Sequence, residues 1–213
     1  MIKEKIVPRE TVTIVPLAPQ HKDRAFAVIE RAIADSFKWE FRHPESKERK
    51  YMPKDIDYLD VINQEVAKQR KHLQESLSGE VEGRKYLAAF SEGGRICGIM
   101  GYDRSISGEI VKALPHFSHL VHKEDIDAQV IAAYVDPDFQ QKGIASQLFN
   151  TILNEFGREG IRRFALFSGY EKGQIAWTRL LHAAPNVSLV NYYEDGADCW
   201  VWVMELKQGQ KVT

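Results

Sequence analysis

The apolar positions of the chain repeat with two different periods, and the order of these periods predicts a mixed α/β protein. Short β-branched or alternating runs are typical of strands, and the unbroken apolar run 128–135 is typical of a strand buried on both faces. A Gly-Gly turn and the turn 194–198 each predict a hairpin. The predicted strands are 11–17, 86–90, the run from Ile96, 128–135, 162–168, 187–193 and 199–206.

Helical spacing of apolar residues predicts four helices between these strands. The first covers about 20–37, after which the polar and aromatic stretch 38–50 breaks the pattern. The second opens at Pro53 and Asp55 and ends at Gly79 and Gly83, and the last two cover about 144–156 and 173–184. The stripes are Phe26, Ile29, Ile33 and Phe37; then Ile56, Leu59, Ile62, Val66, Leu73 and Leu77; then Ile144, Leu148, Ile152 and Phe156. This order predicts layers around one sheet, not a doubly wound parallel fold.

Length and composition narrow the class of protein. With 213 residues, 44% apolar residues and a net charge of -1, the chain is expected to fold as a single domain over 1–213, with a core of about 11–206 and a frayed tail. The absence of a basic surplus argues against nucleic-acid binding. The opening MIKEKIVPRE lacks a signal-peptide core and no run could span a membrane, so we expect a cytoplasmic protein. Cys97 and Cys199 are expected to be buried, reduced thiols.

The stretch VDPDFQQKGIASQL, from Val135 to Leu148, joins the buried strand to a helix through a glycine. Such a junction exposes successive backbone N–H groups at the positive end of a helix, which is a typical anion site. Gly143 permits close approach of a ligand, Ala145 leaves the next N–H accessible, and Lys142 adds positive charge. The chain carries neither of the familiar glycine-rich nucleotide motifs, so mononucleotide and dinucleotide binding lose support.

This stretch resembles the acyl-CoA-binding motif of GCN5-related N-acetyltransferases (GNAT), which is [RQ]-x-x-G-x-[GA] after a strand ending in V-x-P. Gln140, Gly143 and Ala145 fill the motif, and Val135 and Pro137 fill the preceding pair. The resemblance implies the GNAT fold, an α/β fold with a mixed, predominantly antiparallel sheet and helices on both faces. It also implies acetyl-CoA as co-substrate and transfer of acetyl to a primary amine. The implied CoA-binding residues are Ala133, Tyr134 and Val135 for the pantetheine arm, and Gln140, Gln141, Lys142, Gly143, Ile144 and Ala145 for the pyrophosphate.

The chain departs from the family at both side chains that often serve the chemical step. The tyrosine that protonates the departing thiolate falls on Leu180 or Leu181, so His182 is the nearest titratable residue. His182 is a candidate acid or a helix-end residue, and Tyr170, Tyr192 and Tyr193 are alternatives. The strand glutamate of histone-type members falls on Gln129. Asp127, two residues earlier on the same face, is a candidate base or a solvated strand-end carboxylate.

Other sequence features favour structural roles. His116, His119 and His122 recur every third residue, but interleaved apolar residues favour an amphipathic segment, and we expect no metal site. Trp200 and Trp202 alternate with valines, which places one face of their strand in the core. The run 37–51 is a candidate acceptor-binding wall or a plain connection.

Three functions are therefore compared. The preferred one is an N-acyltransferase acting on a small-molecule or peptide amine; the alternatives are a CoA-binding module without catalytic activity and a structural or interaction protein. A homodimer paired through the closing hairpin is a further expectation.

Overall fold

Seven strands form one sheet in the order β1-β2-β3-β4-β5-β7-β6. A computed structural model describes residues 10–42, 58–117, 121–193 and 197–206. Every neighbouring pair is antiparallel except β4 and β5, which run parallel. The strands are β1 (Thr13–Pro16), β2 (Lys85–Phe90), β3 (Ile96–Asp103), β4 (Ala128–Val135), β5 (Arg163–Ser168), β6 (Val187–Leu189) and β7 (Cys199–Glu205).

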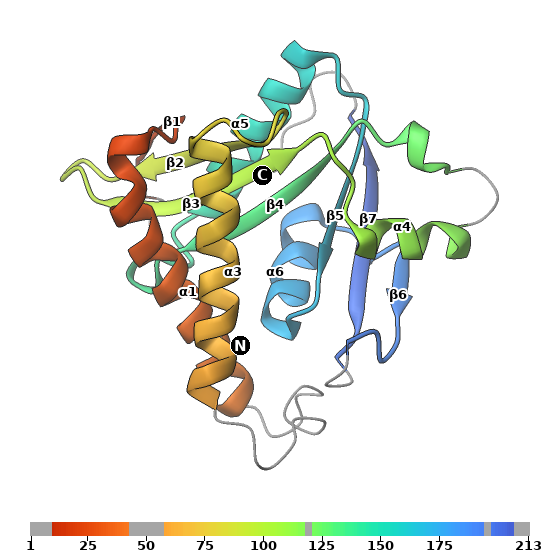
Figure 1. Cartoon of the computed structure of the whole chain (residues 1–213), viewed down its shortest axis with the longest axis horizontal. Coiled ribbons are helices and arrows are strands. Elements are labelled where there is room, and N and C mark those ends of the chain that lie inside the picture. Colours follow the sequence, from red (N-terminus) through yellow and green to blue (C-terminus); the bar gives the residue numbers. More distant parts are fainter. Residues whose placement is uncertain (1–9, 43–57, 118–120, 194–196, 207–213) are drawn as a thin grey trace, which may run out of the picture.

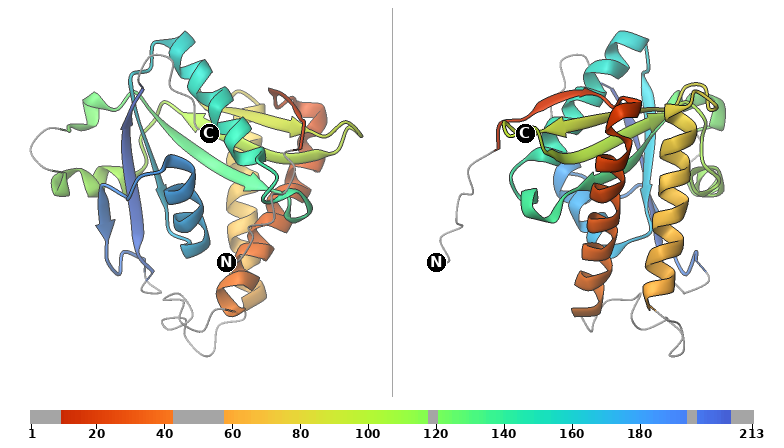
Figure 2. Two further views of the ribbon diagram at one scale, coloured as in Figure 1. Left: turned by 180° about the vertical axis from the view of Figure 1, so that it is seen from behind. Right: turned by 60° about the vertical axis from the view of Figure 1, so that its left-hand side comes forward.

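Helices cover both faces of this sheet (Figures 1 and 2). One face carries α5 (Ile144–Glu159) and α6 (Glu171–Leu181), which bury their apolar sides against β2–β5 and β7. The other face carries α1 (Lys22–Arg42) and α3 (Tyr58–Leu77) over β2–β4, and α4 (Gly108–Ala113) over β5–β7. The predicted mixed α/β fold with a predominantly antiparallel sheet is confirmed.

The strongest sequence patterns produce the predicted elements. β4 has the predicted bounds, and the predicted hairpin joins β2 to β3. The α5 stripe of Ile144, Leu148, Ile152 and Phe156 is fully buried, because these positions share one face of the helix. Gly160 ends α5 in the left-handed conformation that glycine adopts without steric cost.

Weaker sequence patterns predict the ends of helices and strands less accurately. The first helix does not end at Phe37: α1 continues to Arg42, because apolar periodicity reports contact with the sheet and not the end of backbone hydrogen bonding. Leu59 of the predicted α3 stripe is 61% exposed, so that assignment is wrong, and Ile56 lies outside the described residues. The final hairpin forms, but β6 is only three residues long.

Several expectations about single residues are confirmed. Cys97 and Cys199 are buried free thiols, and Trp202 is buried while Trp200 is only partly so. Within the described residues, no helix combines the length and apolar character that crossing a bilayer requires. The predicted frayed tail lies outside the described residues.

Candidate functional site

The sheet divides between β4 and β5. These strands pair only at Ala128 with Phe164 and at Gln129 with Ala165. Beyond that point β4 continues along β3 to Val135, while β5 continues along β7 to Ser168. In the described part of the chain, no strand pairs with this edge of β4 beyond Gln129, so an extended ligand could pair with its backbone.

A bulge deforms β4 at this edge. Ile131 pairs with Gly101 and Tyr134 pairs with Ile99, so Ala132 and Ala133 together face one residue of β3. Ala132 has a φ of 52°, a left-handed value that costs free energy in a residue other than glycine. Ala133 is exposed although β4 is an inner strand. The predicted pantetheine-binding residues Ala133, Tyr134 and Val135 thus lie along an accessible edge.

The junction between β4 and α5 folds as a compact turn. A short 3-10 helix, Pro137–Phe139, is capped by the Asp136 carboxylate, which accepts a hydrogen bond from the Asp138 N–H. Two residues of the following turn have left-handed φ values, Gln141 at 63° and Gly143 at 79°. Left-handed residues in such a turn can direct successive N–H groups toward one side, which produces a concave anion site.

The first turn of α5 completes this concave site. Gly143 is the N-cap residue, and its carbonyl accepts the first intrahelical hydrogen bond, from the N–H of Gln147 at 3.1 Å. The preceding amides of Ile144, Ala145 and Ser146 have no acceptor within the helix, so their N–H groups point out of its N-terminus. The helix dipole adds partial positive charge at the same place.

Lys142 belongs to this turn, and its side chain has contacts of its own. Its ammonium lies 4.7 Å from the centre of the Phe139 ring and 3.5 Å from the Glu10 carboxylate. The Glu10 N–H donates to the Lys142 carbonyl at 3.1 Å. The segment before β1 therefore fastens the turn from outside and leaves the ammonium at its rim.

The side chain of Gln140 points to α1 and α6. Its amide nitrogen donates to the Asp35 carboxylate at 3.1 Å and to the Val135 carbonyl at 3.3 Å, and its oxygen accepts from the Lys172 ammonium at 3.3 Å. Asp35 and Lys172 also form an ion pair. Gln140 thereby ties the turn to both helices that flank the divergent strands.

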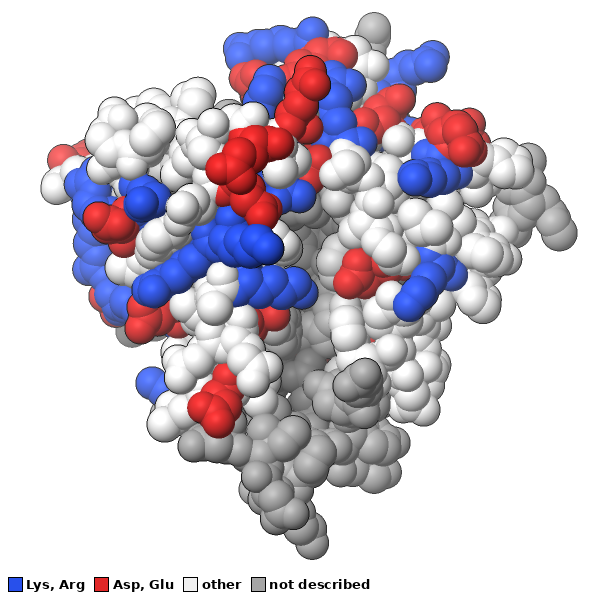
Figure 3. All heavy atoms as spheres, viewed as in Figure 1, with Lys and Arg blue, Asp and Glu red and all other residues white. Residues whose placement is uncertain are grey.

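The surface is hollowed on the side of the sheet that carries α1, α3 and α4. Figure 3 shows this depression between the α3 side and the α4 side of the molecule, where β4 and β5 separate. Phe37 of α1 and Tyr170 before α6 contact each other with ring centres 5.4 Å apart. Phe37, the first residue of the predicted acceptor wall, is itself buried in the core. Residues 43–51 of that wall lie outside the described residues.

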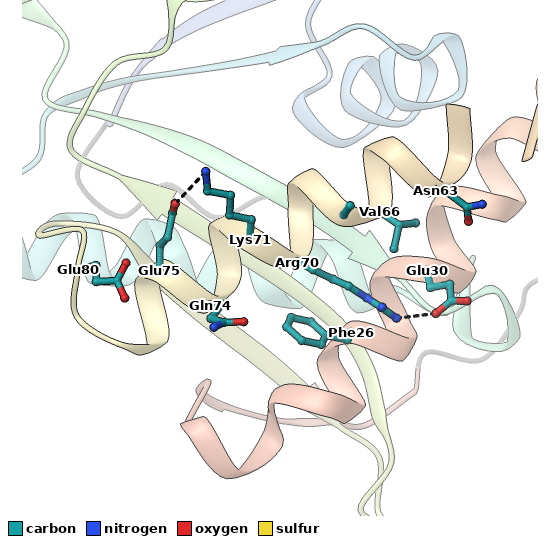
Figure 4. Close-up of a pocket in the computed structure, with 10 residues that line it drawn as sticks. Phe26, Glu30, Asn63, Val66, Arg70, Lys71, Gln74, Glu75 and Glu80 are labelled. Atoms are coloured by element: carbon teal, nitrogen blue, oxygen red, sulfur yellow. Dashed lines mark hydrogen bonds and ion pairs between the residues drawn. The ribbon is translucent and has the colours of Figure 1, made fainter. Parts of the chain in front are cut away.

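A second hollow of about 680 Å³ lies between α1 and α3 (Figure 4). Its cations already have partners: Arg70 donates to Glu30 at 2.7 Å and lies over the Phe26 ring, and Lys71 lies 3.8 Å from Glu75. None of its described lining residues belongs to the β4–α5 junction. This hollow is separate from the candidate site.

Asp127 lies at the start of β4, next to the paired end of β5. Its carboxylate accepts hydrogen bonds from the N–H groups of Arg162 at 2.7 Å and Arg163 at 2.9 Å. Burial opposes ionisation, but the two backbone hydrogen bonds outweigh it and lower the pKa of Asp127. This arrangement favours the strand-end role; a role as base stays a prediction.

The residues at the two positions where the family usually has its glutamate and tyrosine make structural contacts. Gln129 is buried, and its carboxamide bonds the Ser105 carbonyl at 2.7 Å and the Ser107 N–H at 3.2 Å. Leu180 and Leu181 pack against the core. His182 is exposed and ends α6 in a left-handed conformation. Its role as acid is not tested by this geometry.

The alternative tyrosines occupy different surroundings. Tyr170 precedes α6 beside the divergent strands, whereas the rings of Tyr192 and Tyr193 meet edge to face with centres 4.9 Å apart and pack against the cluster under α4. Burial raises the pKa of Tyr193, and burial likewise raises that of Tyr134 in β4. Among the described residues, no three His, Cys, Asp or Glu side chains converge as a metal site requires, and His119 lies outside them.

Comparisons with known proteins agree with this architecture. The ribosomal-protein-S18-alanine N-acetyltransferase from Escherichia coli superposes with a TM-score of 0.56 at 15% identity, covering 94% of this chain and 97% of that chain. PaiA N-acetyltransferase from Thermoplasma acidophilum, solved in complex with coenzyme A, gives 0.55 at 13% identity, covering 90% and 98%. An N-acetyltransferase from Staphylococcus aureus Mu50 gives 0.54 at 18%, covering 93% and 100%. At these identities the similarity shows the fold alone.

Sequence comparison identifies the family independently of the fold. No curated protein sequence matches the chain. The sequence profile of the Acetyltransferase (GNAT) family matches residues 33–178, which is more than half of the chain and includes β4, the turn and α5. The chain therefore belongs to the GNAT acetyltransferase family.

Proposed function

We propose that this protein transfers an acetyl group from acetyl-CoA to a primary amine, by direct attack of the amine on the thioester in a ternary complex. The observation that carries the proposal is the unpaired β4 edge, which runs directly into a left-handed glycine and the N-terminus of α5. Membership of the GNAT acetyltransferase family supports it, as does the similar fold of a relative solved with coenzyme A. We also propose that residues 11–206 act as one domain.

The two parts of the site match the two parts of CoA. The amides of residues 141–145 would hold the pyrophosphate, with the helix dipole and Lys142 adding positive charge. The Gln140 N–H already donates to the Pro137 carbonyl at 3.4 Å. The amides of the pantetheine arm would pair with β4 at Ala133–Val135, as an added strand does. The acyl group would then reach the gap between β4 and β5, next to the depression that can admit an amine.

The chemistry proposed here relies on position more than on a dedicated side chain. An amine with a lysine-like pKa of about 10.4 must lose a proton before it attacks. Because the Asp127 carboxylate already accepts two backbone hydrogen bonds, we propose that water carries this proton away. The CoA thiol resembles a cysteine, with a pKa of about 8.5, so its thiolate can depart without a strong acid. Alignment of the amine with the thioester then supplies most of the rate.

A thiol-release assay with a panel of amines tests this function. The purified protein would be given acetyl-CoA and small-molecule amines, polyamines, or peptides with a free N-terminus or lysine. Amine-dependent thiol release, with an acetyl mass added to the acceptor, is the expected result. Tight CoA binding without transfer to any amine would favour a CoA-binding module, the alternative that Gln129 and Leu180 motivate. Absence of CoA binding would contradict both.

A further inference from the structure

Two arginines from distant parts of the chain hold the two aspartates of the DPD sequence before the turn. Arg31, in the middle of α1, places Nη1 3.1 Å from Asp136 and Nη2 2.9 Å from Asp138. Arg95, just before β3, places its Nη2 3.0 Å from Asp136 and 2.8 Å from Asp138. We name these four residues the DPD bracket.

The DPD bracket differs from an ordinary surface ion pair because one of its carboxylates is almost fully buried. The side chain of Asp136 is only 3% exposed, and its N–H donates to the Cys97 carbonyl at 2.8 Å. The Arg95 guanidinium also lies 5.1 Å from the centre of the Phe139 ring. Hydrogen bonds from Arg31 and Arg95 lower the pKa of Asp138. Loss of either arginine would leave the nearly buried Asp136 carboxylate with one guanidinium partner instead of two, which weakens the compensation of its charge.

The DPD bracket directly precedes the concave turn. Pro137–Phe139 is held from the α1 side and from the β2–β3 hairpin, and Gln140–Gly143 follows at once. Within that turn Gln141 has a left-handed φ, a conformation that persists only when its surroundings impose it. Rigid anchoring of the preceding helical turn is such a constraint, because it fixes where the chain enters the turn.

We propose that Arg31, Arg95, Asp136 and Asp138 are positioning residues that hold the amides of the turn in the geometry that binds the pyrophosphate of acyl-CoA. This inference rests on the proposed function. It adds that the DPD bracket determines the preference of the enzyme for a donor with a pyrophosphate over the same thioester without one. The four side chains act through the backbone they hold, and need not touch the donor.

An alternative is that the arginines simply attract the phosphates of the donor. The two explanations predict opposite changes in acetyl-CoA affinity for Asp138→Asn. If the arginines only attracted phosphates, Asp138→Asn would strengthen acetyl-CoA binding, because it removes a negative charge near the site. If the bracket positions the amides, Asp138→Asn weakens binding, because both guanidinium groups lose an anchor. The geometry also distinguishes the two arginines. Arg31 uses two nitrogens to reach two carboxylates, whereas one nitrogen of Arg95 reaches both.

The experiment compares acetyl-CoA with S-acetylpantetheine, which lacks the pyrophosphate. For Arg31→Ala and Asp138→Asn we expect the KM for acetyl-CoA to rise by about 10- to 100-fold, as for small misplacements of a binding group, with an unchanged kcat. The KM for S-acetylpantetheine should change by less than about twofold, because that donor does not use the turn. Arg31→Lys should lose most of the affinity and Arg95→Lys clearly less. Arg158→Ala, which breaks an exposed ion pair at the other end of α5, is the matched control.

Other outcomes overturn the proposal. Tighter acetyl-CoA binding by Asp138→Asn would support charge attraction, and equal losses on both donors would indicate general damage to the fold. A wild-type protein that binds CoA but transfers no acetyl group would refute the proposed function alone. In that case, calorimetric Kd values for CoA on the same variants still test the bracket. Wild-type protein that does not bind CoA would overturn both proposals.

Discussion

Substitution of Gly143 by glutamate tests the anion site with a control on the same helix. Gly143 and Gly160 flank α5 at its two ends, and their φ values are 79° and 71°. A residue with a side chain in this conformation costs about 1–2 kcal/mol. Gly143→Glu and Gly160→Glu should therefore lose similar free energy of unfolding. The Gly160 variant should lose slightly more, because a carboxylate at a helix C-terminus is opposed by about 0.3–1 kcal/mol from the dipole.

The two variants should differ sharply in CoA binding. A carboxylate about 4 Å from a phosphate opposes it by about 4 kcal/mol at an effective dielectric constant of about 20, or roughly 10³-fold in Kd. Gly143→Glu should therefore bind CoA at least that much more weakly, while Gly160→Glu binds as the wild type does. Calorimetric titration gives the Kd values, and denaturant unfolding gives the stabilities. Wild-type affinity in folded Gly143→Glu, or equal losses in both variants, would refute the assignment of the turn.

Further variants test five individual residues. Asp127→Asn should lose about 1–3 kcal/mol of unfolding free energy, because its two amides lose a charged acceptor, yet keep its turnover; a 10²-fold slower enzyme with CoA still bound would identify a base. His182→Ala and Tyr170→Phe should each keep more than about a tenth of the wild-type turnover, and a hundredfold loss in either would reveal an acid. Gln141→Val should unfold more readily than Gln141→Gly, since valine tolerates a positive φ poorly; equal stabilities would argue against the left-handed turn. Burial opposes ionisation of Glu159, but hydrogen bonds from Lys85, Tyr102 and Arg104 outweigh it and lower its pKa to about 2. The wild type should therefore lose up to about 3 kcal/mol more than Glu159→Gln as the pH falls from about 4.5 to 2, in acid unfolding curves that would otherwise run parallel.

The sequence predicted those parts of the fold that depend on local periodicity. The bounds of β4 and the buried stripe of α5 followed from continuous and helical apolar patterns. The continuation of α1 beyond Phe37 was missed because a helix can extend past its contact with the sheet without any apolar signal. The exposure of Leu59 could not be foreseen either, since a stripe does not show where the covering surface stops.

The candidate site was predictable in position but not in its supporting contacts. The strand, glycine and helix of the turn are consecutive in sequence, so their geometry is local. The left-handed φ of Gln141 was not predictable, because the residue is not a glycine. Arg31 and Arg95 meet Asp136 only after α1 and the β2–β3 hairpin pack onto the sheet, so no spacing reveals them. Asp127 was read as a possible base because the amides of Arg162 and Arg163 come from another strand.

A structure determined with CoA bound tests the central claim most directly. The account predicts that the pyrophosphate oxygens lie within about 3 Å of the backbone nitrogens of residues 141–145, the normal length of an N–H···O hydrogen bond. It also predicts that the pantetheine arm runs along Ala133–Val135, with the thiol in the gap between β4 and β5. CoA bound elsewhere, for example in the hollow between α1 and α3, with the turn left empty, would contradict it.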